Sequence, residues 1–192
     1  GAAPGKARVE IGLYNPSVPD GAERIAVVGD SGAAADDRVL LGAVAIDIAP
    51  PQASLDDLTP LDARFDERIA LAGWSAHAAA DDPTTLVIDL AWESSDRVTS
   101  DYTAFVHLLD PDGAIVAQFD QPPGASDNPT SGWLPDERTR TEFPLAGGAS
   151  AGPGHSLRIG LYEPVSGRQL PASGSDAEPG ATYVLLPLEV QP

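Results

Sequence analysis

Cysteine and methionine are both absent from this chain of 192 residues, and histidine occurs only three times. The lack of cysteine excludes disulfide bonds, thiol catalysis and cysteine-ligated metal sites. A folded domain must therefore be held by its hydrophobic core, which a chain of this length can supply. His77, His107 and His155 are far apart in the sequence and form no histidine motif of a metal site.

Positive charge and long apolar runs are also scarce. Lysine and arginine number 11 against 29 aspartates and glutamates, which gives a formal net charge of −18. Such a surface repels phosphate backbones and anionic lipids, so we expect no nucleic-acid partner. No apolar run approaches the roughly 18–20 residues that a membrane helix requires, so we expect no membrane span in this chain.

No arrangement typical of catalysis is present. The chain has no Gly-x-Ser-x-Gly motif, and the turn-like stretch 29–32 contains an aspartate that would repel phosphate. His107 alternates with Phe105 and Leu109, which predicts a half-buried structural histidine rather than a catalytic one. We therefore predict that the protein is not an enzyme and has no cofactor.

Calcium is the alternative to having no cofactor, because calcium binds oxygen ligands and carboxylates are plentiful. Asp110 and Asp112 flank a tight turn, whereas Asp120 stands at the far end of the strand that follows. That strand would separate the carboxylates by about 20 Å, so a shared site is not expected. We interpret all three as turn or surface acids.

Glycine and proline, by contrast, are abundant, with 19 residues each, and they divide the chain into short segments of alternating hydrophobicity. Residues 86–93, 157–162 and 184–190 alternate clearly, and residues 102–109 are apolar on both faces, as in a covered central strand. A turn at 110–113 then predicts a hairpin with 114–120. The pattern predicts an all-β protein, an antiparallel β-sandwich of Ig-like or jelly-roll-like Greek-key type. Further strands are expected near 6–14, 23–28, 37–48, 68–74, 136–143 and 168–171, with one helical turn near 54–58.

An internal repeat is the most informative feature. Residues 8–16 (RVEIGLYNP) match 156–164 (SLRIGLYEP), and residues 38–46 (RVLLGAVAI) match 183–190 (YVLLPLEV). The offset is 148 residues from Ile11 to Ile159 and 145 from Val39 to Val184. In both segments the apolar residues also occupy the same inward-facing positions of the strand. The two segments are therefore predicted to form the same hairpin in two copies.

The repeat predicts the domain organisation. Residues 61–192 are expected to form a complete sandwich, residues 49–60 a proline-rich linker, and residues 1–48 the closing strands of a partial copy, seen as an extra N-terminal β-hairpin segment. On this interpretation the chain begins in the middle of a domain. Half a sandwich cannot bury its apolar face by itself and leaves strand edges open.

The complete copy resembles a known module. The stretch Asp101–Asp110 (DYTAFVHLLD), Gly113, Gln118 and Asp120, Pro129-Thr130 with Trp133, and Gly160-Leu161-Tyr162 carry the resemblance. They resemble the C-terminal extracytoplasmic β-sandwich of bacterial dolichyl-phosphate-mannose mannosyltransferase-like membrane proteins and of related surface proteins. The resemblance implies a non-catalytic domain located outside the cytoplasm, secreted or at the cell surface.

Two functions follow as expectations. In the first, the chain is a structural or filament subunit that self-associates or binds neighbouring β-sandwich domains by strand complementation. Its interface residues would be Val9, Ile11, Leu13, Val27, Leu41 and Val44. In the second, the chain is a carbohydrate-binding appendage with polysaccharide as its partner. Trp133 would then stack on a sugar ring. The alternative for Trp133 is that it plugs one end of the sandwich beneath its loop.

Overall fold

The computed structural model describes residues 6–13, 26–28, 34–36, 38–45, 52–124 and 128–188. For residues 6–10, 34–36 and 40–45 the description covers the backbone only. The chain divides into two compact units, Gly1–Ala49 and Pro50–Pro192. Among the residues described, no helix is long and apolar enough to cross a membrane.

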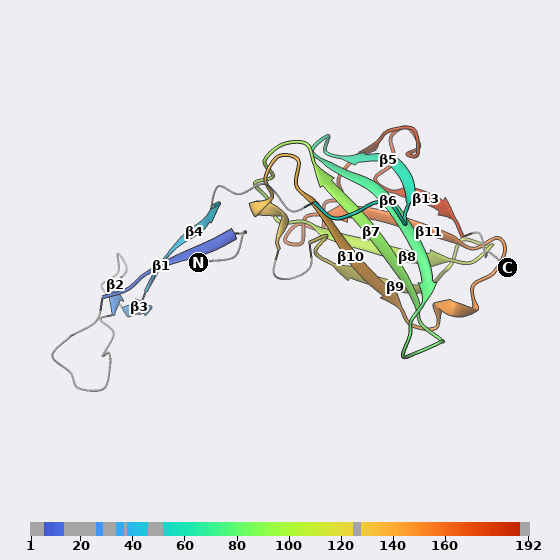
Figure 1. The fold of residues 1–192 in the computed structure, drawn as a ribbon, viewed down its shortest axis with the longest axis horizontal. Coiled ribbons are helices and arrows are strands. Elements are labelled where there is room, and N and C mark those ends of the chain that lie inside the picture. The colour runs from blue at the N-terminus through green and yellow to red at the C-terminus, as the bar shows by residue number, and fades with distance from the viewer. Residues whose placement is uncertain are drawn as a thin grey trace. The chain divides into compact units, whose positions relative to one another are not determined.

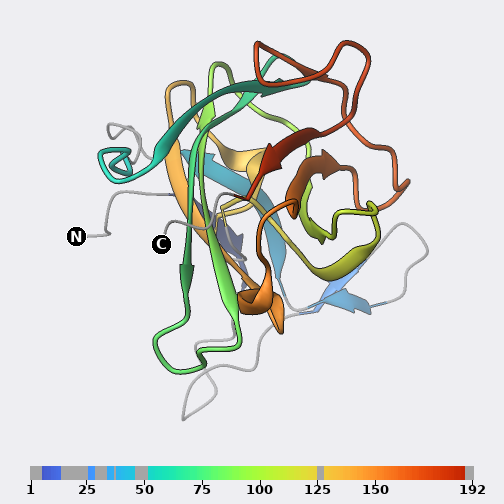
Figure 2. The same ribbon diagram turned by 90° about the vertical axis from the view of Figure 1, so that its right-hand side faces the viewer.

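The second unit is an antiparallel β-sandwich, which confirms the predicted fold class (Figures 1 and 2). Its five-stranded sheet has the order β10 (Arg138–Leu145), β7 (Leu86–Ser94), β6 (Ile69–Ala78), β5 (Thr59–Phe65), β12 (Ala172–Ser173). Its four-stranded sheet has the order β13 (Val184–Pro187), β11 (Ser156–Tyr162), β8 (Thr103–Leu109), β9 (Ile115–Gln121). Two short 3₁₀ turns, η1 (Thr130–Gly132) and η2 (Gly148–Ser150), lie in the connections.

The core lies between the two sheets and follows the alternation of the strands. On β8, Ala104, Val106 and Leu108 point into it, and on β11, Leu157, Ile159 and Leu161 do the same. Phe65, Trp92, Trp133 and Phe143 are the large aromatic side chains that fill it. On the opposite face of β8, Phe105 and Leu109 are buried too, which explains why this strand is apolar on both faces.

The hairpin predicted at 102–120 is confirmed. Strands β8 and β9 pair in antiparallel register, with Val106 opposite Phe119. The Asp110 carboxylate accepts hydrogen bonds from the backbone N–H groups of Asp112 and Ala114, and Gly113 adopts a positive φ of 82°. This is the local reason for an Asp-Pro-Asp-Gly sequence at the turn.

The first unit contains two small antiparallel sheets among its described residues. β1 (Lys6–Ile11) pairs with β4 (Val39–Ala45), and β2 (Val27–Val28) pairs with β3 (Ala34–Asp36). In β1 and β4, Ile11 is opposite Val39 and Glu10 is opposite Leu40.

The corresponding residues of the second unit pair in the same way. Ile159 is opposite Val184 and Arg158 is opposite Leu185, which are the counterparts of those two pairs at the offsets of the repeat. The agreement extends further, because Val27 is opposite Asp36 and, 145 residues on, the N–H of Ala172 donates to the carbonyl of Ala181. At these positions the repeat found in the sequence is therefore a repeat of strand register, whereas a register shift between Arg8 and Glu10 has no counterpart in the pairing of β11 with β13.

Two local expectations are wrong. Residues 54–58 form a single hydrogen-bonded turn, with the N–H of Leu58 donating to Leu55, rather than a helical turn. The strand expected at 168–171 is the two-residue β12, which starts at Ala172. Strand β5 was missed, although Leu61, Ala63 and Phe65 alternate with Asp62 and Arg64; it begins at Thr59, inside the stretch 49–60 that was predicted to be a linker.

Candidate functional site

Three apolar side chains of the first unit are exposed although their counterparts in the second unit are core residues. Ile11, Leu13 and Val39 are 51%, 67% and 42% exposed. Their counterparts Ile159, Leu161 and Val184 are 0%, 0% and 1% exposed. Val27 is half-buried, whereas its counterpart Ala172 is buried. Three positions of the repeat that are buried in the second unit are thus exposed in the first.

The other residues predicted for the interface lie in the same hairpin. Val9 belongs to β1, and Leu41 and Val44 belong to β4. Their side chains are outside what the structure describes, so their part in an interface stays a prediction.

The edges of the two hairpins also differ. In the second unit β11 is a central strand, because β13 pairs with one edge and β8 with the other. In the first unit β1 pairs with β4, and no strand among the described residues pairs with its second edge. An unpaired edge presents backbone N–H and C=O groups that can accept another strand.

Trp133 is fully buried, so it does not stack on a sugar as we had proposed as one alternative. Its indole N–H donates to the carbonyl of Asn128, and it follows directly on η1. The Thr130 hydroxyl donates to the carbonyl of Ser100 and accepts the N–H of Tyr102, which fixes the loop over the ring. A ring without accessible surface cannot contact a ligand, and the other interpretation of Trp133, as a plug at one end of the sandwich, is correct.

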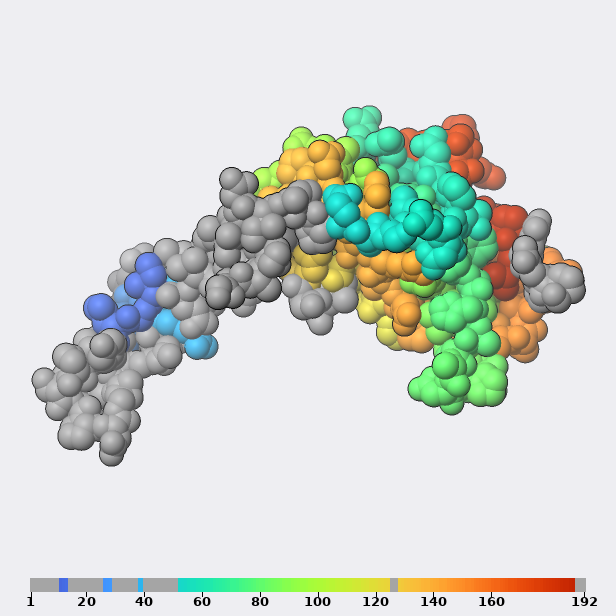
Figure 3. Space-filling model, in the orientation of Figure 1, coloured from blue at the N-terminus to red at the C-terminus, as the bar shows by residue number. Residues whose placement is uncertain are grey.

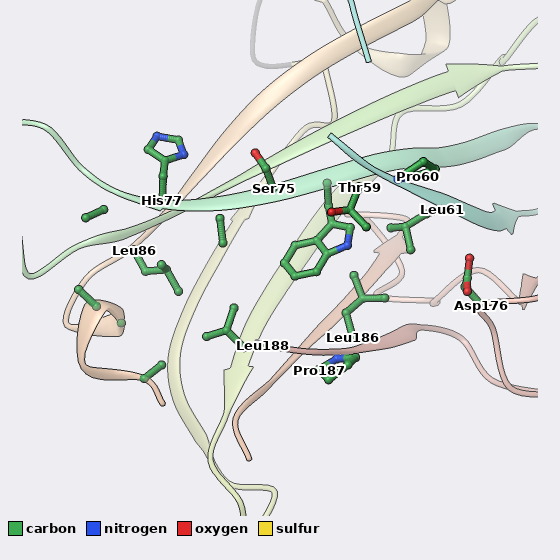
Figure 4. Close-up of a pocket in the computed structure, with 16 residues that line it drawn as sticks. Thr59, Pro60, Leu61, Ser75, His77, Leu86, Asp176, Leu186, Pro187 and Leu188 are labelled. Atoms are coloured by element: carbon green, nitrogen blue, oxygen red, sulfur yellow. The ribbon is translucent and has the colours of Figure 1, made fainter. Parts of the chain in front are cut away.

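A groove on the second unit contains a tryptophan that the sequence did not single out. It has a volume of about 890 Å³ and opens between β6 and the end of β13 (Figure 4). Trp74, Leu61 and Leu186 supply apolar surface and Thr59 supplies a hydroxyl group, whereas the side chains of Ser75 and His77 project from the other side of β6 (Figure 4). His77 and Asp176 lie at opposite ends of the groove (Figure 4).

A β-bulge is the reason that Trp74 reaches this groove. In β6, Ile69 and Leu71 point into the core, so strict alternation would place Trp74 on the outer face. The pairing of β6 with β7 shifts between Leu71 and Gly73, and Trp74 stands opposite the core residue Leu90. The bulge therefore turns the half-buried ring to the inner face, a change that alternation alone does not reveal.

His107 has the structural environment that its sequence position predicts. It is half-buried on the outer face of β8, with its ring 4.9 Å from that of Phe105 and its Nδ1 3.2 Å from the Arg158 guanidinium. Burial, together with the charge of Arg158, holds the pKa of His107 below its ordinary value of 6.5, and the more distant Asp120 opposes this shift. A neutral imidazole beside an arginine and an aromatic ring is a packing element of the sheet face.

Acidic side chains do not gather into a metal site in the part of the chain that is described. No group of three or more histidine, aspartate or glutamate side chains is arranged there to hold a metal ion. Asp120, which was weighed with Asp110 and Asp112 for calcium, instead accepts a hydrogen bond from the Tyr162 hydroxyl.

Comparison with known proteins adds one fold-level likeness. No family model and no curated protein matches the sequence. The solved structure of the C-terminal domain of Wzt is similar to this chain at 9% sequence identity and a TM-score of 0.42, over 70% of this chain and 81% of that one. These values are too low to carry an argument about function.

Proposed function

We propose that this protein is a non-catalytic assembly module, whose first unit joins it to another β-sandwich. The observation that carries the proposal is the exposure of Ile11, Leu13 and Val39, whose counterparts in the second unit are buried. Burying a side chain of this size in an interface contributes about 1.5–3 kcal/mol to the free energy of association, so burying all three would favour association strongly. The open edge of β1 adds backbone hydrogen bonds to that drive.

The location and family of the protein belong to the same proposal. The resemblance to the C-terminal sandwich of mannosyltransferase-like membrane proteins favours a place outside the cytoplasm. An acidic, cysteine-free module that joins to its own kind by strand complementation suits a cell-surface or filament subunit, either by self-association or by binding a neighbouring sandwich domain.

The mass of the protein in solution tests the assembly proposal. We expect the full chain to form dimers or larger species that light scattering detects, and we expect Leu13→Asp to return it to a monomer. Val165→Asp is the matched control, because Val165 is 95% exposed and lies in the connection after β11, outside the strands of the second unit. A full chain that stays monomeric at high concentration, or that associates equally well with Leu13→Asp, would refute the proposal.

Carbohydrate binding is the second candidate, and the groove beside Trp74 is what favours it. A half-buried indole beside the Thr59 hydroxyl, with the Asp176 carboxylate at the end of the groove, suits a sugar subsite, in which the ring stacks and the polar groups fix orientation. Calorimetric titration with oligosaccharide fragments of bacterial polysaccharides tests this. Binding that Trp74→Ala abolishes and Val165→Asp preserves would support it, and the absence of binding to every fragment would count against it.

A further inference from the structure

The residue pattern of the strand that completes the first unit can be deduced from the second unit. We propose that the open edge of β1 accepts an antiparallel strand with the pattern of β8, carrying an aromatic residue opposite Gly12 and an apolar residue opposite Ile11. This inference rests on the proposed assembly function and names the partner that it requires: a β8-like strand supplied by another sandwich.

The first argument comes from where the two equivalent strands end. In the second unit β13 pairs with β11 only as far as Ile159, whereas β8 pairs with Gly160–Tyr162 as well, where the other edge has only a bridge from Tyr162 to Gln169. In the first unit β1 ends at Ile11, the counterpart of Ile159, and Gly12 and Leu13 are not in a strand. Up to Ile11 the described part of the first unit thus has a partner strand that corresponds to β13, and no described strand of it corresponds to β8.

The second argument comes from a glycine kept in both copies. A side chain on Gly160 would clash with the ring of Phe105, which lies directly against its backbone, and with the carbonyl oxygen of Thr182. The strand pairing places Phe105 opposite Gly160. Gly12 is the counterpart of Gly160 and is exposed, so it leaves room for an aromatic ring in the same position.

The third argument fixes the register. In the second unit Val106 is opposite Ile159 and Ala104 is opposite Leu161. Transferred to the first unit, these pairs place an apolar residue opposite Ile11 and a small residue opposite Leu13. The incoming strand would then place apolar side chains beside Ile11 and Leu13, which are both exposed.

A peptide with the sequence of Asp101–Asp110 tests the inference on the full chain. We expect calorimetry to detect binding, and amide hydrogen exchange to slow at Gly12 and Leu13, which have no strand partner among the described residues. Gly12→Val should weaken binding about ten-fold or more, because the added side chain occupies the place of the ring. Gly152→Val is the matched control, since a side chain at Gly152 meets nothing within 4 Å.

The peptide also has its own control, in which alanine replaces the phenylalanine of the Phe105 position. Equal binding of that peptide, equal binding by Gly12→Val, or protection at another strand would overturn the inference. If the peptide fails to bind while Leu13→Asp still abolishes association of the full chain, the partner is wrong but the assembly function stands. If the full chain also fails to associate, the assembly function itself is refuted.

Discussion

Arg140 and Asp89 form a two-point ion pair between the neighbouring strands β10 and β7, with nitrogen–oxygen distances of 2.7 and 3.0 Å. Asp89 is buried, and the opposite side of the guanidinium binds Asp57 at 2.8 and 2.9 Å. The segment that contains Asp57 (cyan in Figure 3) thereby lies on the surface next to β10, to which residues 52 and 53 also pair. Hydrogen bonds to Asp89 and Asp57 raise the pKa of Arg140, so this cation is permanent.

Removing the arginine should therefore cost more than removing either acid. We expect Arg140→Met to lower the free energy of unfolding by about 3–5 kcal/mol, because Asp89 is left as a buried charge without its partner. Asp57→Asn should have a much smaller effect, since Asp57 is largely exposed and Arg140 keeps Asp89. Urea denaturation of the two variants checks the order, and equal losses would contradict this account.

Phe105 should be a strong determinant of stability even though it lies on the outer face of β8. Its side chain is buried over Gly160, and its ring centroid is 6.4 Å from that of Tyr162. We expect Phe105→Ala to cost about 3–5 kcal/mol, as for other large buried side chains. Thermal and urea unfolding measure this, and a loss below about 1 kcal/mol would show that the face is not packed.

His107 should make stability depend on pH near neutrality. Because the folded protein holds the pKa of His107 below 6.5, the unfolded chain takes up the proton first as the pH falls. The free energy of unfolding should therefore decrease from about pH 7.5 downward until the folded pKa is passed. His107→Gln should flatten this part of the curve.

A separate loss is expected at lower pH. Hydrogen bonds from Ser175 and from Thr84 lower the pKa values of Asp62 and Asp82, so their contribution is lost as the pH falls below about 4. Urea titrations at half-unit steps separate the two regions. A curve for His107→Gln that stays as steep as that of the parent protein between about pH 5 and 7.5 would refute the assignment to His107.

Trp133 should be structural and have no effect on ligand binding. We expect Trp133→Ala to cost about 3–5 kcal/mol, because it empties a site at the end of the core. Trp133→Phe should cost less but still lose the hydrogen bond to Asn128. Calorimetry with oligosaccharides then provides the contrast: any binding that depends on Trp133 in a protein that remains folded would contradict the burial of this ring.

The sequence predicted what depends on local pattern. Alternation along residues 102–109, followed by Asp110 and Gly113 at the turn, was sufficient for the β8–β9 hairpin, because both strands and their turn are contiguous. The repeat of IGLY and VLL was sufficient for two equivalent hairpins, since equal phase requires equal register. These features need no knowledge of distant contacts.

What the sequence did not predict depends on irregularities and on distant partners. The bulge after Leu71 reverses the face of Trp74, and no residue type marks it unambiguously. Trp133 was left between two interpretations because its burial depends on Thr130 bonding to Ser100, thirty residues earlier. The groove is formed by the bulged strand β6 and the end of β13, which belong to different sheets. It can therefore be recognised only in the folded structure.

The distribution of the three tryptophans gives the protein a built-in optical probe. Trp92 and Trp133 have no accessible surface, Trp74 lines the groove, and residues 1–49 contain no tryptophan. A collisional quencher such as acrylamide should therefore reach the emission of one indole of the three, the one in the groove. A ligand in the groove would shield that emission, so a single unlabelled sample can report binding in the groove.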